Sequence, residues 1–257
     1  MKKKLIGVTT AALVAIAGAG NTMAQDGVVY IPVDIIPCKY NEGRGPADLD
    51  AAVEKFNAYM DENAVDTYAA WTMTKQYATP DQDFDFAWVG AHKSGETMGA
   101  GMDRWRENGA EMRATFATVA NCESGSNYAS RMFRAPPDGN VPGDGVLVFS
   151  NCELKEGASY QDVITATDAW LGVMAEAGSK AAEYHWYPVY GSNEENLDWK
   201  WITAYDNSTE LGKDYDRIGN GGLFAKQGEL LDDLVECDVA RVYDVTLRRT
   251  GSIRGTD

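Results

Sequence analysis

Two stretches of this chain read as copies of one another. Cys38 and Cys122 frame the first stretch, Cys152 and Cys237 frame the second, and the two separations differ by a single residue. A regular repetition of this kind is typical of folds built from equivalent units. The duplication therefore predicts a molecule made of two similar halves.

The two copies also share anchors in one order. Residues 85–89, DFAWV, correspond to residues 198–202, DWKWI, and an Asn-Gly step follows in each copy at Asn108 and at Asn220. Chance would rarely place these anchors in the same order with such small gaps. No catalytic signature of comparable strength occurs, so the duplication constrains the architecture more than the function.

The first residues are typical of a signal peptide. Lys2–Lys4 form a basic start, Leu5–Ala19 an apolar stretch, and Thr22–Ala24 a small-residue cleavage site. The apolar stretch is short and contains glycine, which favours cleavage over the alternative of a retained N-terminal anchor. We therefore expect a periplasmic or secreted protein that has no membrane contact after cleavage.

Charge and composition narrow the choice of partners. The formal net charge is −16, and removal of the three N-terminal lysines makes it more negative still. Such a surface repels nucleic acid and anionic lipid, so nucleic-acid binding is excluded. The hydrophobic content of 44% supplies a sizeable core, and the length suits two closely packed halves.

Periodicity predicts strand, helix, strand, strand, helix, strand in each copy. In the first copy the expected strands are 28–36, 67–77, 84–90 and 128–134, with helices starting at Pro46 and near Met98. In the second copy we expect strands 146–150, 182–190, 197–205 and 239–248 and helices 159–177 and 209–235. The predicted segments are a signal peptide (1–24), a first repeat (25–134), a linker (135–145), a second repeat (146–249) and a tail (250–257).

This order is the split βαβ arrangement of ferredoxin-like folds, so the predicted class is α+β with two tandem βαββαβ repeats. In that arrangement the end of the first strand lies beside the start of the fourth, where each cysteine pair falls. We therefore predict the bridges Cys38–Cys122 and Cys152–Cys237 among the three connectivities that four cysteines allow. Free buried thiols are the weaker alternative, and a metal or catalytic role is weaker still because no Cys-x-x-Cys spacing occurs.

With its element order, its duplication and anchors such as Trp88 and Trp201, the chain resembles the dimeric α/β-barrel superfamily. Members pair two ferredoxin-like sheets or fuse two such units, so the resemblance implies an intramolecular pseudo-dimeric barrel. They include cofactor-independent oxygenases, haem-handling enzymes, isomerases, small-molecule binders and stress proteins. The resemblance thus implies the place of a site more than a reaction, and no specific family is matched.

Aromatic residues on the expected strands are candidates for lining a cavity between the two sheets. With two polar residues on the last strand, the ligand-binding candidates are Trp71, Trp88, Trp199, Trp201, Tyr187, Arg241 and Tyr243. The alternative is that these rings only fill the core, because aromatic side chains dominate cores through their area alone. Alternation separates the two sides of a strand but does not tell which side faces the cavity.

The catalytic candidates are His185, His92 and Tyr205. His185 lies within an expected strand, and His92 follows another strand where the second copy has Tyr205. A polar side chain in an apolar cavity can serve as a general acid or base, and a histidine there can also ligate haem. The simpler reading is a hydrogen-bonded strand histidine or an exposed loop histidine.

No metal site is predicted. Asp81, Asp83 and Asp85 resemble the start of a calcium loop, but Phe86 stands where the loop needs glycine, and His92 where it needs glutamate. The sequence also contains no Walker loop, dinucleotide fingerprint or serine nucleophile elbow. It identifies no cofactor.

Three functions remain open, and the sequence does not decide whether the chain is an enzyme. The first is an exported, disulfide-stabilised protein that binds a small molecule in an aromatic-lined cavity. The second is a cofactor-independent oxygenase-like or isomerase-like enzyme that uses a His or Tyr in that cavity. The third is a scaffold or stress-related interaction protein with a filled barrel. Fusion of two units favours a monomer, and association through exposed sheet edges is the alternative.

Overall fold

The computed structural model describes residues 27–80, 82–136, 139, 143–191 and 197–253. The predicted signal peptide lies outside these residues. The first half comprises β1 (Tyr30–Tyr40), α1 (Pro46–Glu62), β2 (Tyr68–Tyr77), β3 (Phe86–His92), α2 (Gly95–Asn108), α3 (Ala110–Ala117), β4 (Ala120–Cys122) and β5 (Ser126–Arg134). The second half repeats this order as β6 (Gly145–Leu154), α4 (Tyr160–Glu176), β7 (Ala182–Tyr190), β8 (Trp199–Tyr205), α5 (Ser208–Gly219), α6 (Leu223–Leu231), β9 (Val235–Cys237) and β10 (Arg241–Arg249).

The strands form one antiparallel sheet that closes on itself. The order is β10–β2–β3–β1–β5–β7–β8–β6, and β6 pairs again with β10. Two of these pairings join the halves, β5 with β7 and β2 with β10. The result is a mixed α+β barrel, in agreement with the α+β class that the sequence predicts.

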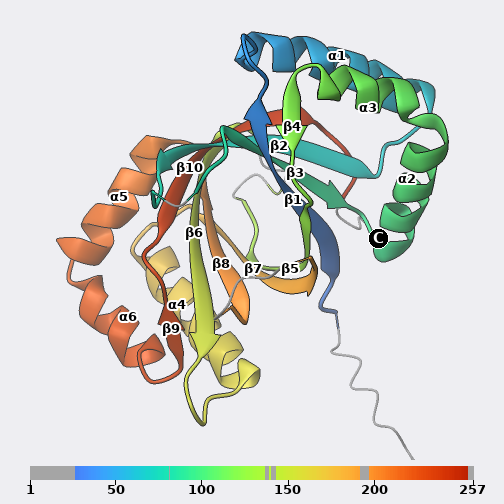
Figure 1. Cartoon of the computed structure of the whole chain (residues 1–257). Coiled ribbons are helices and arrows are strands. Elements are labelled where there is room, and N and C mark those ends of the chain that lie inside the picture. The colour runs from blue at the N-terminus through green and yellow to red at the C-terminus, as the bar shows by residue number, and fades with distance from the viewer. Residues whose placement is uncertain (1–26, 81, 137–138, 140–142, 192–196, 254–257) are drawn as a thin grey trace, which may run out of the picture.

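The helices lie outside the barrel, over its strands. Figure 1 shows α1, α2 and α3 together over the strands of the first half, and α4, α5 and α6 over those of the second half, on the opposite side. Each strand therefore has one face toward the barrel interior and one toward helices. The main buried cluster lies in the interior and includes Val33, Val89, Tyr128, Ile202 and Val245. Smaller clusters lie between sheet and helices, such as that of Phe56 with Met112 and that of Trp170 with Leu231.

Local sequence signals fix several helix ends. Ser159 caps α4, where its Oγ accepts a hydrogen bond from Asp162 N at 3.3 Å and the Asp162 carboxylate accepts one from Ser159 N at 3.1 Å. This reciprocal pair satisfies backbone donors that the first turn leaves open. Pro46 begins α1, a position where its missing N–H costs nothing.

Each half contains two short elements beyond the six that periodicity predicts. A single helix over 209–235 is wrong, because Asn220–Gly222 interrupts it and separates α5 from α6. Gly222 takes a left-handed φ of 78° there, a conformation that favours glycine. In the first half the break between α2 and α3 falls at Gly109, whose φ of −83° is not left-handed.

Both predicted disulfides are confirmed. Cys38 bonds Cys122 and Cys152 bonds Cys237, with Cα–Cα distances of 4.0 and 4.1 Å. The second cysteine of each pair lies not at the start of the fourth long strand, as expected, but on the short strands β4 and β9. These pair with the ends of β1 and β6, which aligns each cysteine with its partner.

Disulfides of this kind are typical of oxidising compartments outside the cytosol. The two disulfides therefore agree with an oxidising compartment outside the cytosol, which is the compartment expected for an exported protein. Of the helices in the described part of the chain, none combines the length and apolar character needed to cross a membrane.

We predict that replacing both members of one disulfide destabilises the whole barrel. The double variant Cys38→Ser, Cys122→Ser should lower the free energy of unfolding by about 2–5 kcal/mol, because the bridge no longer restricts the unfolded chain. The double variant Cys152→Ser, Cys237→Ser should show a similar loss, since its bridge closes a loop of nearly the same length. Denaturant titration measures both. A wild-type midpoint in either variant would contradict the prediction.

Candidate ligand-binding site

Strand alternation decides which side chains face the barrel interior. On β1 the interior receives Ile31, Val33 and Ile35, while Cys38 faces the helices. On β8 it receives Lys200, Ile202 and Ala204, and the rings of Trp199 and Trp201 lie on the opposite face. The interior wall is therefore built from both halves.

Two cavities lie inside the barrel. The smaller has a volume of about 130 Å³ and a mostly apolar wall that includes Val33, Trp71, Val89, Trp186, Ile202 and Val245. The larger has a volume of about 560 Å³ and a more polar wall that includes Gln82, Phe84, Lys200, Arg241 and Tyr243. A closed barrel with this much interior space provides room for small molecules.

An aromatic cluster lies among the interior side chains between the strands of both halves. The ring of Trp186 lies 5.5 Å from that of Phe149 and 6.3 Å from that of Tyr128, between ring centroids. Trp186 lines the smaller cavity, and Phe149 and Tyr128 line the larger one. Met73 lines both, and its flexible thioether suits a wall that adapts to what it contacts.

The polar side chains of the larger cavity are held by hydrogen bonds. The Tyr243 hydroxyl donates to Gln82 Oε1 at 2.6 Å. Lys200 Nζ donates to Asn151 Oδ1 at 2.8 Å and lies 5.5 Å from the centre of the Tyr128 ring. Such contacts fix the orientation of groups that a ligand would meet.

Arg241 is held by a carboxylate from the loop before β10. Its two terminal nitrogens donate to both oxygens of Asp238, at 2.8 and 3.0 Å. Three ligand-binding candidates from the sequence, Trp71, Arg241 and Tyr243, thus line a cavity.

The other ligand-binding candidates, Trp88, Trp199, Trp201 and Tyr187, lie on the helix side of the sheet. Trp88 packs against Phe56 of α1, with 5.5 Å between ring centroids, and its indole nitrogen donates to the Tyr68 hydroxyl at 2.8 Å. Trp199 is fully buried, and Tyr160 of α4 lies against it at 5.8 Å. None of these four lines either cavity, so their binding roles stay predictions.

His185 is also on the helix side, and it is fully buried. Its ring packs against Phe133 at 4.3 Å and Trp201 at 4.7 Å, between centroids. Burial, and then the charge of Arg131, lowers the pKa of His185 to about 3. Neither ring nitrogen has a hydrogen-bond partner in the described part of the chain. The imidazole is therefore neutral at ordinary pH.

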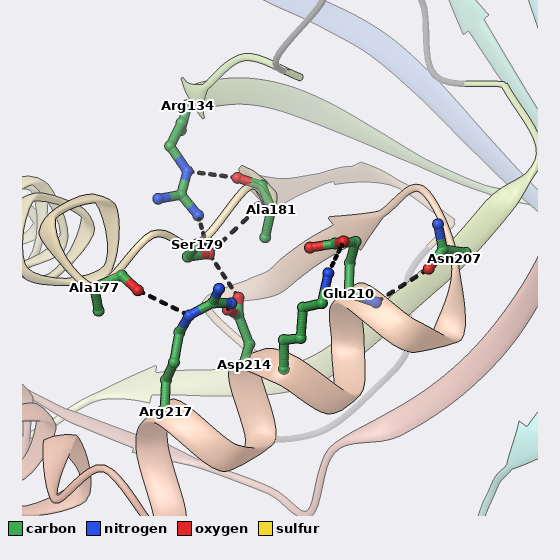
Figure 2. Close-up of polar contacts among 9 residues, drawn as sticks. Arg134, Ala177, Ser179, Ala181, Asn207, Glu210, Asp214 and Arg217 are labelled. Carbon is green, nitrogen blue, oxygen red and sulfur yellow. Dashed lines mark hydrogen bonds and ion pairs between the residues drawn. The ribbon is translucent and has the colours of Figure 1, made fainter.

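Tyr205 ends β8 beside a buried polar network, which Figure 2 shows for the residues around Ser179. The Ser179 hydroxyl donates to Asp214 at 2.6 Å and accepts from Arg134 at 3.0 Å. Arg217 forms an ion pair with Asp214. Burial, followed by the charge of Asp214, raises the pKa of the Tyr205 hydroxyl. The hydroxyl thus keeps its proton.

Glu183 is the most perturbed acid of this region. It is 3% exposed, its Oε1 accepts a hydrogen bond from Trp201 Nε1, and the Thr203 hydroxyl donates to it at 3.2 Å. Burial raises the pKa of Glu183 to about 8, although the charge of Arg134 opposes the shift. The carboxyl group is therefore protonated over much of the neutral range.

His92 differs from His185 because it has a carboxylate partner. Its Nε2 lies 3.2 Å from Asp34 Oδ2, and Asn127 Nδ2 donates to the other oxygen of Asp34 at 2.8 Å. The side chains of His92 and Asp34 are 11% and 30% exposed, so solvent reaches this pair. It lies on the helix side of the sheet near α2, where Met98 contacts Asn127.

Sequence reasoning did not select several cavity residues. Trp186 shares the alternation of Tyr184, and both line the smaller cavity, which Ser130 also lines from the neighbouring strand. Lys200 carried a usable signal, since it is a charged residue between two tryptophans inside a strand. Among the residues that the structure describes, no cluster of three or more His, Cys, Asp or Glu is placed to hold a metal ion.

Comparison with known proteins supports the fold. No family model and no curated protein matches the chain. Among solved structures, it is similar to a putative chlorite dismutase (TM-score 0.53, 9% identity, covering 88% of this chain and 97% of that one). It is also similar to a putative monooxygenase from Lactobacillus acidophilus NCFM (TM-score 0.53, 10% identity, 88% and 97%) and to an anthrone oxidase-like protein (TM-score 0.51, 10% identity, 89% and 96%).

These structures share the mixed α+β fold of the chain over most of its length. At such low identity the likeness shows the fold alone. It assigns the chain to no specific family.

We predict that Glu183→Gln flattens the pH dependence of stability above pH 6.5. The folded-state pKa of Glu183, about 8, exceeds its ordinary value of 4.5, so the folded state holds the proton more tightly than the unfolded state. The stabilisation is complete below pH 4.5 and is lost as pH rises toward 8, on the order of 5 kcal/mol in all. The neutral amide of Gln removes this loss and still accepts from Trp201.

Denaturant titrations between pH 6.5 and 8.5 measure the slope, with the exposed Glu229→Gln as the control that should leave it unchanged. His185 acts in the opposite direction, because its lowered pKa reduces stability only as pH falls below 6.5. The chosen window therefore excludes its contribution. Equal slopes in wild type and Glu183→Gln would contradict the prediction.

Proposed function

We propose that this is an exported protein that binds a small, partly apolar molecule inside its barrel. The observation that carries the proposal is the unfilled interior, with cavities of about 130 and 560 Å³ lined by inward side chains of both halves. The larger volume falls in the range of ordinary ligand sites, roughly 300–1,000 Å³. A protein that served only as a scaffold would gain stability from filling this space.

The walls suit such a ligand. Apolar and aromatic side chains supply most of the surface, and a few polar groups, such as the Tyr243 hydroxyl and the Arg241 guanidinium, are available to fix orientation. Export is supported by the signal-peptide pattern of residues 1–24 and by the two disulfides.

The proposal includes the origin of the barrel. Residues 25–134 and 146–249, joined by the linker 135–145, are two tandem ferredoxin-like repeats that act as an intramolecular dimer. The matching element order and the two equivalent disulfides support this. A monomer is the expected state, because the closed ring already uses the strand edges through which single units would pair.

An enzymatic role is the second candidate, and the pair of His92 with Asp34 favours it. A histidine oriented by a carboxylate can take up and release protons, and the partial exposure of this pair leaves it accessible to a substrate. In this candidate function the reaction is a proton transfer of the kind that oxygenase-like or isomerase-like enzymes use. His185 and Tyr205 fit this role less well, since both are held in one protonation state.

We predict that filling one cavity abolishes binding of the compound which that cavity holds. Ala204→Phe fills most of the smaller cavity and Ala87→Phe places a ring in the larger one, because each alanine lines that cavity from an inward strand position. Calorimetry with a panel of small aromatic and alicyclic compounds measures the affinities. Each variant serves as the control for the other, at a similar packing cost of about 1–3 kcal/mol.

A compound that binds in the barrel should lose measurable affinity for one variant and keep it for the other. The native fold of each variant is checked by its circular dichroism and its intact disulfides. If every bound compound keeps its affinity for both variants, the barrel interior is not the binding site.

For the enzymatic candidate, we predict that His92→Gln lowers kcat by about 100-fold or more with little change in KM, because the general base is lost. Lys93→Gln, at the adjacent exposed position, is the control. Steady-state kinetics with compounds selected by binding measures both variants. Unchanged kcat in His92→Gln would remove this pair from the reaction.

A further inference from the structure

Arg131 is a buried cation without a counter-charge among the described residues. It is 9% exposed, and no Asp or Glu in the described part of the chain forms an ion pair with it. Arginine does not lose its proton in proteins, so the guanidinium stays charged. An uncompensated buried charge destabilises a fold, and native proteins normally pair such a group.

The chain pairs other arginines that are covered to a similar degree. Three further arginine side chains are between 9% and 16% exposed, and each forms an ion pair with a carboxylate: Arg241 with Asp238, Arg248 with Asp50, and Arg249 with Asp61. Arg131 departs from this pattern.

The duplication shows that the architecture does not need this charge. Arg131 of β5 pairs with His185 of β7, and at the other junction Thr246 of β10 pairs with Thr72 of β2. His185 and Thr72 occupy equivalent register positions, opposite Trp201 and Trp88 respectively. Arg131 therefore corresponds to Thr246, and a small neutral residue serves at the same place in the second half.

Aromatic side chains surround the guanidinium on the helix side of the sheet. The Arg131 Cζ atom lies 4.4 Å from the centre of the Phe133 ring, and Tyr30 pairs with Arg131 across β1 and β5. The ring of Tyr187 lies 6.0 Å from that of Tyr30 and 5.7 Å from that of Tyr160, between centroids. Tyr30 and Tyr160 are 42% and 40% exposed, so this group of rings reaches the surface.

The guanidinium can be reached from that surface. Its Nη1 atom is enclosed without a hydrogen-bond partner among the described residues, whereas Nε and Nη2 keep accessible surface. Burial raises the pKa of the Tyr187 hydroxyl, so this group keeps its proton and can donate. The charges that act on Tyr187 and His185 come from Arg131 and from tyrosines, with no carboxylate of the described residues among them.

We propose that Arg131 binds the carboxylate of a small aromatic acid at the outer face of the β5–β7 junction, with the ring of the acid beside Tyr30 and Tyr187. Nε and Nη2 form a fork that matches the two oxygens of a carboxylate. A phosphate group carries more charge and loses more hydration against the tyrosine rings, so a carboxylate fits better. Arg131, Tyr30 and Tyr187 line neither cavity, so the inference does not depend on the binding function proposed for the interior.

The test compares benzoate with its neutral analogue benzamide by isothermal titration calorimetry. Salt at about 0.15 M screens the long-range repulsion of an anion by the acidic surface. Arg131→Met should weaken benzoate by about 10–100-fold, the value of hydrogen bonds to a charged group, and benzamide by less than about twofold. Arg131→Lys keeps the charge without the fork and should fall between wild type and Arg131→Met. Acetate should bind wild type about 10-fold more weakly than benzoate, because it has no ring.

Denaturant titration separates a binding role from a structural one. Without ligand, Arg131→Met should keep or raise the wild-type midpoint, because it removes an uncompensated charge. Benzoate in excess should raise the midpoint of wild type and not that of the variant. A lower midpoint in the ligand-free variant would assign Arg131 to the architecture and overturn the proposal.

The matched control is Arg106→Met, which removes the same charge at an exposed position of α2 and should leave benzoate affinity unchanged. Ala204→Phe and Ala87→Phe locate the ligand. If either weakens benzoate as strongly as Arg131→Met should, the acid binds inside the barrel and the site at Arg131 is wrong. If wild type binds neither benzoate nor benzamide, or binds both equally, the proposal falls while the interior cavities remain candidates.

One further variant tests for a partner from the chain itself. Asp26 precedes β1 in the sequence and lies outside the described residues. Asp26→Asn should leave benzoate affinity unchanged. A gain of about 10-fold or more would show that this carboxylate competes for the guanidinium, and would overturn an external ligand as its partner.

Discussion

Reciprocal pairing between the halves is the constraint on which the structure depends. β5 pairs with β7 and β10 pairs with β2, so each half gives its last long strand to the second strand of the other. An open sheet would leave these edges unpaired and its inward face exposed to water. Closing the ring satisfies both requirements together, and the interior exists only because both halves contribute to its wall.

The two junctions between the halves, β5–β7 and β10–β2, have similar structures. This is expected when two equivalent units pair through equivalent surfaces. Each contains an irregularity near the end of the donated strand, between Met132 and Arg134 in β5 and between Leu247 and Arg249 in β10. The arginine after each bulge contacts the loop that follows the first helix of the other half. Arg134 donates to Ser179 Oγ at 3.0 Å, and Arg249 donates to the backbone carbonyl oxygen of Val65.

Sequence patterns predict those parts of the architecture that depend on the order of residues along the chain. The cysteine spacing predicts both disulfides, and the bounds expected for β7, residues 182–190, agree with the structure. The short strands β4 and β9 escape prediction because three residues give no periodicity. The partners that stabilise them, the ends of β1 and β6, are distant in sequence.

The side of each strand that faces the cavity could not be predicted, because alternation is symmetric between the two faces. On β3 and β8 the largest rings, such as Trp88 and Trp201, lie under helices, and smaller residues such as Ala87 and Ala204 face the interior. On β7 both faces carry large rings, because Trp186 faces the barrel interior and His185 faces the helices. Ring size alone therefore does not identify the cavity wall, since both faces of a barrel strand are buried.

On the helix side of the sheet, the second half carries buried ionisable groups. An equivalent position in the first half holds a different residue with different contacts. His185 and Thr72 occupy equivalent register positions, opposite Trp201 and Trp88 respectively. Thr72 accepts a hydrogen bond from Arg248 at 2.8 Å, whereas the neutral His185 is enclosed by aromatic rings. The adjacent Glu183 retains its proton through burial. The two groups of β7 whose protonation affects stability near neutral or mildly acidic pH, Glu183 and His185, thus both lie on the helix side of the sheet and line neither cavity.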